Sequence, residues 1–298
     1  MPTMLEVNDL THRYGQGGGG QLAISELSFT VEANQLACIV GPSGCGKSTL
    51  LRCIAGLIKA TTGDILLHGD EVKGVPDDLA VVFQDYSRSL FPWLSVRRNV
   101  EFPLKSKGLD SAKRRSRAEE ALGWVGLSDV GGKYPWQLSG GMQQRVAIAR
   151  ALACQPALLL MDEPFASVDA QTRFELEDLL LRVRKQHEST VLLVTHDIDE
   201  SVYLGDRVLV LSRSPARIMA DLTVDLPTDR DQITTRELPG FVALRGEVAR
   251  LLHGARPEAT DTAADTDAEN RTADEDAARR FLEAERDEAR QACESPVQ

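Results

Sequence analysis

The sequence predicts an α/β fold with a mostly parallel sheet, an antiparallel β subdomain and an inserted helical lobe. Short, fully apolar runs such as LACIV and ALLLM alternate with helical patterns, which is typical of parallel strands covered by helices. Two segments with alternating apolar residues open the chain, and a charged helical stretch interrupts the later alternation of strands and helices. Each of the three parts is therefore indicated by its own pattern.

The first part of the chain supplies the β subdomain and one buried strand. Residues 5–14 and 23–34 both alternate, and the glycine-rich stretch between them predicts a hairpin. The apolar run 36–40 ends at a glycine and predicts a buried parallel strand, which is followed by a helical pattern over 46–58. The segment GDILLHG, residues 63–69, predicts a further strand.

A helical lobe is expected over roughly residues 87–155. Residues 109–127 are charged and helical in pattern, and residues 139–153 form a second helical segment. One face of the second segment carries Met142, Val146, Ala149 and Ala153.

Strands return in the segments ALLLMDE, TVLLVTHD and RVLVLS, with a long helix between the first two. The segment FVALRGEVARLL places apolar residues on one helical stripe, so we expect a packed helix there. We expect one folded domain over residues 1–253. From residue 254 onward Ala, Thr and Asp dominate, which predicts a disordered acidic tail over residues 254–298.

The charge of the chain argues against nucleic acid as a partner. Of the formal net charge of −11, the 13 acidic and 6 basic residues from residue 256 onward contribute −7. Neither the tail nor the rest offers the basic surface that nucleic-acid binding uses. The five cysteines form no C-x-x-C pair, which favours a reducing compartment over a metal or disulfide framework.

Neither a secretory signal nor a membrane helix is predicted. The segment MPTMLEVNDL has no basic region followed by an apolar run. The longest apolar runs fall far short of the roughly 20 residues that a membrane helix needs. Any role at a membrane is therefore expected to depend on a partner.

The segment GPSGCGKST fits the phosphate-loop pattern G-x-x-x-x-G-K-[ST] and lies, as the mechanism requires, between a buried strand and a helix. Its glycines let successive backbone N–H groups point at one anion, and the helix N-terminus adds positive potential. Lys47 is expected to reach the β- and γ-phosphates, and Ser48 to offer its hydroxyl to Mg²⁺. The pattern thus predicts a P-loop NTPase that binds ATP and Mg²⁺. The nucleotide-binding residues of this loop are Gly41, Pro42, Ser43, Gly44, Cys45, Gly46, Lys47, Ser48 and Thr49.

Two carboxylates follow a later apolar strand. Asp162 ends the run ALLLMD and can hold Mg²⁺ through water, and Glu163 comes next, where it can polarise an attacking water. Alone, this pattern would indicate a strand ending in a polar turn. Beside a phosphate loop it favours a metal-binding residue and a catalytic base.

Three further side chains are candidates with a second interpretation each. His196 ends another apolar strand, where it either makes a local hydrogen bond or contacts the γ-phosphate at the sheet edge that binds ligands in α/β folds. Gln84 also ends a strand and can offer its amide oxygen to Mg²⁺. Tyr14 either stacks on a purine ring or is an ordinary strand aromatic before a turn.

The segment LSGGMQQ predicts a second phosphate-binding helix N-terminus, which uses Ser139, Gly140, Gly141 and Gln143. One active site cannot easily use both phosphate-binding elements, because the loop at residue 41 already occupies one side of the triphosphate. Two copies arranged head to tail can use both, since each signature then closes over the ATP of the other chain. We therefore expect a homodimer with two identical sites.

In this order, these residues resemble the ATPase subunit of an ABC transporter over about residues 4–212. The resemblance rests on Tyr14, the phosphate loop, Gln84, LSGGMQQR, LLLMDEP, the segment SVDA and His196. It implies that Asp169 of SVDA contacts the partner subunit near the nucleotide, and that His196 is a switch residue. It also implies a peripheral position at the cytoplasmic face of the cell membrane, through a permease. The segment after Gln84 would receive a coupling helix of that permease, with Phe91, Pro92 and Trp93 either lining the docking groove or simply packing the lobe.

The finer resemblance is to ATPases of importers for nitrate, alkanesulfonates and taurine. It rests on VFQD…LFPWLSVRRNV, GKYPWQLSGGMQQR and DLPTDRD…FVALRGEVARLL. It implies an ATP-hydrolysing motor for uptake of a small anionic solute, with a solute-binding protein outside the membrane. The ATPase of an exporter, or of an importer for another solute such as a pyrimidine precursor, shares the ATP-binding residues and stays an alternative. A soluble ABC protein on ribosomes or DNA, and a purely regulatory nucleotide-binding module, fit the sequence less well.

Overall fold

The computed structural model describes residues 2–15, 20–84, 89–166 and 168–254. The chain divides into residues 1–255 and residues 256–298, and only the first unit contains described residues. The acidic tail expected over residues 254–298 lies outside the described residues, apart from Gly254.

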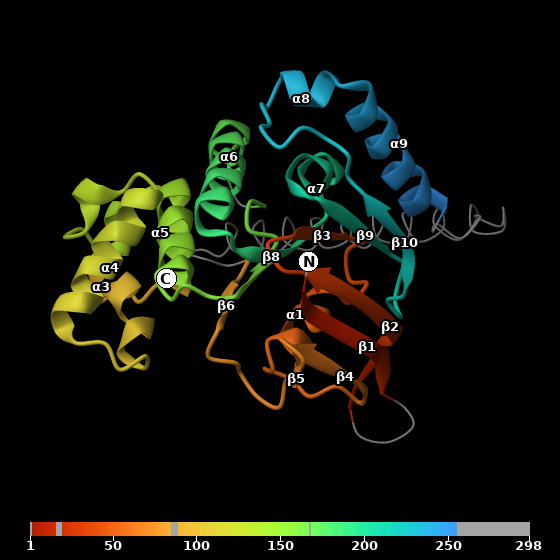
Figure 1. Cartoon of the computed structure of the whole chain (residues 1–298), viewed down its shortest axis with the longest axis horizontal. Helices are drawn as coiled ribbons and strands as arrows, with labels where there is room; N and C mark the ends of the chain where they lie inside the picture. The colour runs from red at the N-terminus through yellow and green to blue at the C-terminus, as the bar shows by residue number, and fades with distance from the viewer. Residues whose placement is uncertain (1, 16–19, 85–88, 167, 255–298) are drawn as a thin grey trace, which may run out of the picture. The chain divides into compact units, whose positions relative to one another are not determined.

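Within the described residues, a six-stranded sheet runs in the order β10-β9-β3-β8-β7-β6 (Figure 1). Neighbouring strands from β9 to β6 are parallel, and β10 pairs antiparallel with β9 at the edge. The prediction of a mostly parallel sheet is confirmed. The strands are β3 (Leu36–Val40), β6 (Leu79–Val82), β7 (Leu158–Asp162), β8 (Thr190–Thr195), β9 (Arg207–Leu211) and β10 (Ile218–Thr223).

Both faces of this sheet are covered, and each face has its own hydrophobic core. In β3, Leu36, Cys38 and Val40 join the core that includes the helical lobe. Ala37 and Ile39 point the other way and join the core formed with β1, β2 and α1. Because every residue of such a strand is buried, the strand is a continuous apolar run in the sequence.

A second sheet, antiparallel and in the order β2-β1-β4-β5, forms the predicted β subdomain. The hairpin of β1 and β2 is confirmed, although residues 16–19 of its connection lie outside the described residues. Figure 1 shows this sheet in red and orange below the large one. Its strands are β1 (Thr3–Tyr14), β2 (Gln21–Glu32), β4 (Thr62–Leu67) and β5 (Asp70–Glu71).

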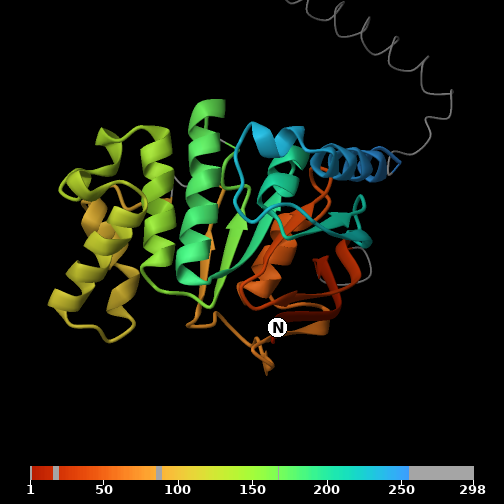
Figure 2. The same ribbon diagram turned by 45° about the horizontal axis from the view of Figure 1, so that its top comes forward.

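The inserted helical lobe packs α3, α4 and α5 against one another (Figures 1 and 2). Each of these helices begins at a side chain that accepts a hydrogen bond from the first turn, namely Ser95, Asp110 and Ser139. The lobe contains α3 (Val96–Glu101), α4 (Ser111–Trp124) and α5 (Gly140–Leu152), with short 3₁₀ turns at Pro103–Lys105, Ser128–Val130 and Pro135–Gln137.

The other helices cover the large sheet. The helix expected over residues 46–58 ends earlier, because Gly56 has φ 67° and a Cβ there would lie 2.1 Å from the Gly74 carbonyl oxygen.

None of the helices in the described part of the chain combines the length and apolar character that crossing a bilayer requires. The helices that cover the large sheet are α1 (Lys47–Ile54), α6 (Ala170–His187), α7 (Ile198–Leu204), α8 (Thr234–Glu237) and α9 (Pro239–Gly254).

The segment after β9 contains one predicted element, α9, and two unpredicted ones, β10 and the short helix α8. The predicted helix FVALRGEVARLL is the body of α9, and it buries Phe241 and Val248. Strand β10 was not predicted. Its residues alternate only between half-buried and exposed, because it lies at the sheet edge, and this gives a weak apolar pattern.

Candidate nucleotide-binding site

The loop after β3 turns sharply through residues 41–46 and leads into α1. Gly44 has φ 74° and Gly46 has φ 119°, conformations that residues with a Cβ rarely adopt. A Cβ at Gly46 would also lie 2.8 Å from the carbonyl oxygen of Ala23. This path directs the free N–H groups of the first turn of α1 toward the loop, which is the arrangement that binds phosphate.

The buried Lys47 side chain folds back over this loop. Its Nζ donates to the carbonyl oxygens of Gly41 and Pro42, at 2.8 and 3.2 Å. The same atom lies 3.8 Å from Oε1 of Glu163, at the end of β7. The ammonium group therefore lies between the phosphate loop and the carboxylate pair that the sequence predicts beside it.

The side chain of Glu163 contacts three other predicted side chains, those of Lys47, Gln84 and His196. Its φ is 44°, and its backbone N–H donates to Val194 of β8 at 2.8 Å. Its Oε2 accepts from Nε2 of Gln84 at 3.1 Å and lies 3.1 Å from Nδ1 of His196. The four side chains come from distant parts of the chain, and they converge because parallel strands end at one edge of the sheet.

Asp162 and Ser48 form the predicted metal-binding pair. The Ser48 hydroxyl donates to Oδ1 of Asp162 at 3.2 Å, and Asp162 is buried. Burial raises the pKa of the Asp162 carboxyl, and the hydrogen bond from Ser48 opposes this shift in part. A cation beside this pair would relieve the cost of burying the carboxylate.

The ligand atoms available here fit Mg²⁺. A hydroxyl, a carboxylate and the amide oxygen of Gln84 are hard oxygen donors, and Mg²⁺ usually combines one or two carboxylates with waters and substrate phosphates. No cluster of three or more His, Cys, Asp or Glu that could hold a metal is found among the described residues. Mg²⁺ at Ser48 and Asp162 would complete its coordination with waters and with phosphate oxygens of a bound nucleotide.

The other residues of the loop divide into exposed and buried ones. Ser43 and Gly44 are exposed at the turn. Cys45 points into the core beside α1, and burial raises the pKa of its thiol. The hydroxyl of Thr49 lies 3.1 Å from that of Tyr14, which holds this ring at the phosphate-loop helix.

Tyr14 is 41% exposed, and its ring meets the ring of His12 edge to face with the centroids 4.7 Å apart. An exposed ring held beside the loop is available to stack on a base. The stacking itself stays a prediction.

The signature segment is built around the N-terminus of α5. The Ser139 hydroxyl accepts from the backbone N–H of Met142 at 3.3 Å and so caps its own helix. The Gln143 amide donates to the carbonyl oxygens of Pro135 and Leu138, at 3.1 and 3.3 Å. Ser139 and Gly140 are exposed, so the first turn of α5 is open to a ligand.

Asp169 lies close to the signature segment in the same chain. It caps α6 by accepting from the backbone N–H of Thr172 at 3.0 Å and from the Thr172 hydroxyl at 2.7 Å. A Cβ at Gly141 would lie 2.5 Å from Cγ2 of Thr172. Gly141 is thus required for the close approach of α5 to α6, a packing role that the sequence did not reveal.

The structure therefore gathers the predicted residues into two groups. The phosphate-loop group contains Lys47, Ser48, Gln84, Asp162, Glu163 and His196, joined by the contacts given above. The signature group contains Ser139, Gly140, Gly141, Gln143 and Asp169. Helix α5 packs in the core on one face of the large sheet, and α1 packs in the core on the other face, so the two phosphate-binding helices lie on opposite faces of the sheet within one chain.

Two polar residues were missed from the sequence, Asn99 in the helical lobe and Arg173 near the site. Asn99 is fully buried, accepts from the backbone N–H of Phe91 at 2.8 Å, and donates to the carbonyl oxygens of Phe91, Leu94 and Ser95. Arg173 forms an ion pair with Asp197 at 3.1 Å. Asn99 lies within the segment LFPWLSVRRNV, but no pattern there marks it as the buried polar residue, and Arg173 lies outside every segment quoted from the sequence.

Asn99 fixes an exposed aromatic surface on the lobe. Phe91 contacts both Trp93 and Phe102, with ring centroids 5.5 and 4.6 Å apart. Trp93 is 70% exposed, and Pro92 beside it is exposed as well. These rings do not simply pack the lobe, although residues 85–88 of the same predicted docking segment lie outside the described residues.

A phosphate loop with carboxylates at the end of the adjacent parallel strands defines a P-loop nucleotide hydrolase. The sequence profile described as "ABC transporter" matches residues 24–166. The nitrate import ATP-binding protein NrtD of Synechocystis sp. is 42% identical over 87% of this chain and 99% of its own length. The taurine import ATP-binding protein TauB of Sinorhizobium fredii is 40% identical over 82% of this chain and 92% of its own. The chain belongs to the ATP-binding subunits of ABC transporters, and it is an ATPase.

Solved structures agree with this assignment. The ATP-binding cassette MJ0796, a dimer bound to ADP and Pi, superposes with a TM-score of 0.66 at 32% identity and covers 74% of this chain and 99% of its own. The protein cbiO1 of Clostridium perfringens, part of the ABC transporter complex cbiONQ, gives a TM-score of 0.68 at 29% identity over 75% of this chain and 89% of its own. ATPases of this family bind ATP, form dimers and work with membrane permease subunits.

Proposed function

We propose that this chain is the ATP-hydrolysing motor of an importer for a small anionic solute, such as nitrate, a sulfonate or taurine. The observation that carries the catalytic part is the position of Glu163, whose carboxylate contacts Lys47, Gln84 and His196 at the end of β7. These contacts bring a base, a phosphate-binding cation and two polar side chains within one hydrogen-bonded cluster.

In this proposal each residue of the cluster has one role. The loop N–H groups and Lys47 bind the β- and γ-phosphates. Glu163 accepts a proton from the attacking water, and it exchanges its present donors for that water when the nucleotide enters. His196 orients Glu163 and contacts the γ-phosphate from the other side.

Mg²⁺ would be held by Ser48 and by Asp162, through water at the latter, with the amide oxygen of Gln84 as a further ligand. When bound, it would neutralise charge on the β- and γ-phosphate oxygens. The Ser48–Asp162 contact at 3.2 Å and the burial of Asp162 support this assignment.

The signature group supports a homodimer. Ser139, Gly140 and Gly141 begin a helix that packs on the opposite face of the large sheet from α1, and Asp169 lies beside them. In a head-to-tail pair, Ser139, Gly140, Gly141 and Gln143 would close over the nucleotide of the partner subunit. Asp169 would contact the partner at the same interface.

The aromatic surface of Phe91, Pro92, Trp93 and Phe102 is the proposed docking site for the permease. It would place the chain peripherally at the cytoplasmic face of the membrane. Exposed rings that a buried Asn99 holds in one arrangement are suited to receive an apolar helix.

The substrate class rests on the relatives. Two of them are named as nitrate and taurine import proteins, and both are similar over more than four-fifths of this chain. Nitrate and the sulfonate of taurine are both small anions. We propose that a solute-binding protein outside the membrane delivers such a solute to the permease.

Replacement of Glu163 by glutamine tests the catalytic proposal. The Glu163→Gln variant should lose activity by on the order of 10²–10⁴-fold, because glutamine cannot accept the proton. ATP should still bind, since the loop and Lys47 are unchanged. The matched control is Glu175→Gln, a half-exposed carboxylate bound to Arg145. Near-normal turnover by Glu163→Gln would remove Glu163 from the role of base.

Purification of the tagged chain from its native membrane tests the transport proposal. An importer should bring down a permease, and a solute-binding protein whose ligand can be measured by calorimetry. A permease without a binding protein would favour the exporter alternative. Recovery of soluble partners alone would contradict a transport role.

A further inference from the structure

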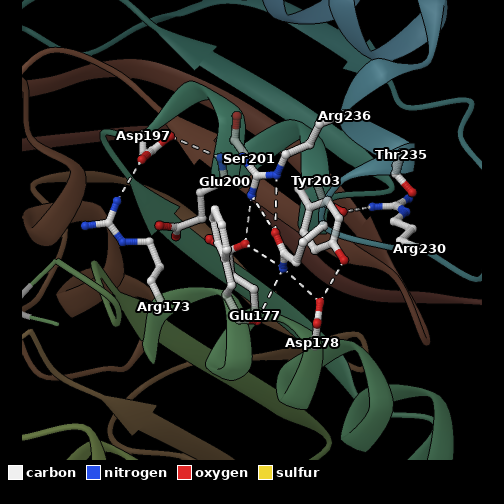
Figure 3. A network of polar contacts seen from close by, with 12 residues as sticks. Arg173, Glu177, Asp178, Asp197, Glu200, Ser201, Tyr203, Arg230, Thr235 and Arg236 are labelled. Atoms are coloured by element: carbon white, nitrogen blue, oxygen red, sulfur yellow. Dashed lines mark hydrogen bonds and ion pairs between the residues drawn. The ribbon is translucent and has the colours of Figure 1, made fainter. Parts of the chain in front are cut away.

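Helices α6 and α7 are joined at their N-terminal ends by one ion pair. Nη1 of Arg173, in the first turn of α6, lies 3.1 Å from Oδ2 of Asp197, which precedes α7 (Figure 3). Both side chains are about one-third exposed. The pair thus joins the helix that begins after Asp169 to the residue that follows His196.

Asp197 uses its two carboxylate oxygens for different purposes. Oδ1 accepts from the backbone N–H of Glu200 at 3.1 Å and caps α7, while Oδ2 is left for Arg173. The backbone N–H of Asp197 is held in turn by the hydroxyl of Thr195, at 3.0 Å. The backbone on either side of His196 is therefore fixed by these bonds.

Packing does not hold the His196 side chain. The side chain is 54% exposed, and its contact with Glu163 is made by a single ring nitrogen. Its direction consequently depends on the backbone at residues 195–197. Loss of the Arg173 contact would leave the Asp197 carboxylate bonded to α7 alone, and its backbone N–H to the Thr195 hydroxyl.

Of the carboxyl groups around Arg173, that of Asp197 is the one to which it is bonded. Its Nε is buried and has no hydrogen-bond partner among the described residues. Two buried carboxyl groups, Glu177 on α6 and Glu200 on α7, are near enough to interact electrostatically with Arg173. Glu177 is instead bound by Arg236, at 2.9 Å. Because Nε of Arg173 has no partner and Nη1 is bonded to Asp197, the position of the guanidinium group depends on the Asp197 carboxylate.

We propose that Arg173 is a positioning residue, whose ion pair with Asp197 holds His196 against Glu163 and links it to the Asp169 end of α6. The proposal rests on the proposed role of Glu163 and His196 in hydrolysis. It adds that a contact of the partner subunit with Asp169 would act on the position of His196 through α6 and the ion pair. Arg173 itself touches neither nucleotide nor metal in this account.

Two substitutions break the pair in different ways. Asp197→Asn keeps the cap of α7, because asparagine caps helices as well as aspartate does, yet it removes the negative charge. Arg173→Gln removes the positive charge from the other side. Each should lower kcat of the full-length protein roughly 10- to 100-fold, the scale that a misplacement of about 1 Å in an active site produces. KM for MgATP should stay within about twofold, and Arg173→Lys should recover most of the rate.

The His196→Ala background separates positioning from general destabilisation. If Arg173 acts through His196, Arg173→Gln will cause no further fall in kcat once His196 is absent. Lys185→Gln is the control, because it removes an ion pair, with Asp229, from the other end of the same helix. The imidazole ¹⁵N resonances of His196 give a readout besides activity, and they should move in Arg173→Gln and stay unchanged in Lys185→Gln.

Two results would overturn the inference. One is a loss of kcat by Arg173→Gln that persists at full size in the His196→Ala background. The other is normal turnover together with unchanged His196 resonances. The second result, combined with an inactive Glu163→Gln variant, would refute the role of Arg173 and leave the proposed function standing. An active Glu163→Gln variant would instead refute the catalytic roles on which the inference depends.

Discussion

Replacing Glu177 with glutamine should change how the stability of the protein depends on pH. Glu177 lies on α6 with its side chain only 1% exposed, and it is bound by Arg236 and Gln232 from the C-terminal segment. Burial raises the pKa of this carboxyl from 4.5 to about 7, and Arg236 and Gln232 offset only part of that shift. Figure 3 shows the network that surrounds it.

The sign and size follow from linkage between protonation and folding. Because the pKa is higher in the folded chain, the protonated carboxyl stabilises the native state at low pH, and this contribution is lost as pH rises through about 7. The shift from 4.5 to about 7 corresponds to roughly 3 kcal/mol. About 2.5 kcal/mol of this falls between pH 5 and pH 8. Glutamine does not titrate, so Glu177→Gln should lack this contribution.

Thermal unfolding of the two proteins at pH 5 and pH 8 measures the effect. The difference between their midpoints should change by about 5–10 °C across this range, since 1 kcal/mol corresponds to about 2–4 °C in a domain of this size. The pKa of Glu200, another buried carboxyl, is raised first by burial and then by the charge of Glu177, so it is raised less in Glu177→Gln, and this changes the difference in the same direction. Glu175→Gln, on the exposed side of α6, is the control and should show a constant difference. A constant difference for Glu177→Gln as well would refute the reasoning.

Three further substitutions test the site and the lobe. Gly141→Ala forces a Cβ to within 2.5 Å of Cγ2 of Thr172. It should therefore lower dimer-dependent ATPase activity while the monomer still binds nucleotide, and Thr172→Ser, which removes that methyl group, should restore the activity. Asn99→Ala removes the side-chain partner of the Phe91 N–H and of the Leu94 carbonyl, and it takes one of two donors from the carbonyls of Phe91 and Ser95. It should lower the free energy of unfolding by about 2–4 kcal/mol and reduce co-purification with the permease, whereas an unchanged melting curve would contradict the role given to Asn99. Tyr14→Ala should weaken ATP binding about 5- to 100-fold if the ring stacks on the base, Tyr14→Phe should have little effect, and equal Kd values in a binding titration would rule out stacking.

The strands and most helices were predictable because their signals are local. A strand buried on both faces, such as β3, has to be apolar throughout, and a helix with one buried face repeats its apolar residues at helical spacing. Strand β10 escaped prediction because an edge strand buries only part of each residue. The early end of α1 has a local signal in Gly56, but the apolar residues beyond this glycine extend the helical pattern to residue 58.

The candidate site was predictable where chemistry imposes a motif. The phosphate loop, Asp162 and Glu163 follow apolar strands directly, so topology alone brings them to one edge. The pair of Arg173 and Asp197 depends on how α6 packs beside α7, and the need for Gly141 depends on Thr172 of another helix. Contacts between segments that are distant in sequence leave no periodic trace in either segment.

The position of β3 in the sheet has a consequence for synthesis on the ribosome. This strand carries the phosphate loop at its end, and both of its neighbours, β8 and β9, come from residues 190–211. At about 5–20 residues per second, β3 waits roughly 10–30 s for its first partner strand to be made. Until then its five apolar residues have no neighbouring strand, and a nascent chain cut short before residue 190 lacks both strands that pair with β3. The ATPase is thus completed late in translation, although its most recognisable motif is made early.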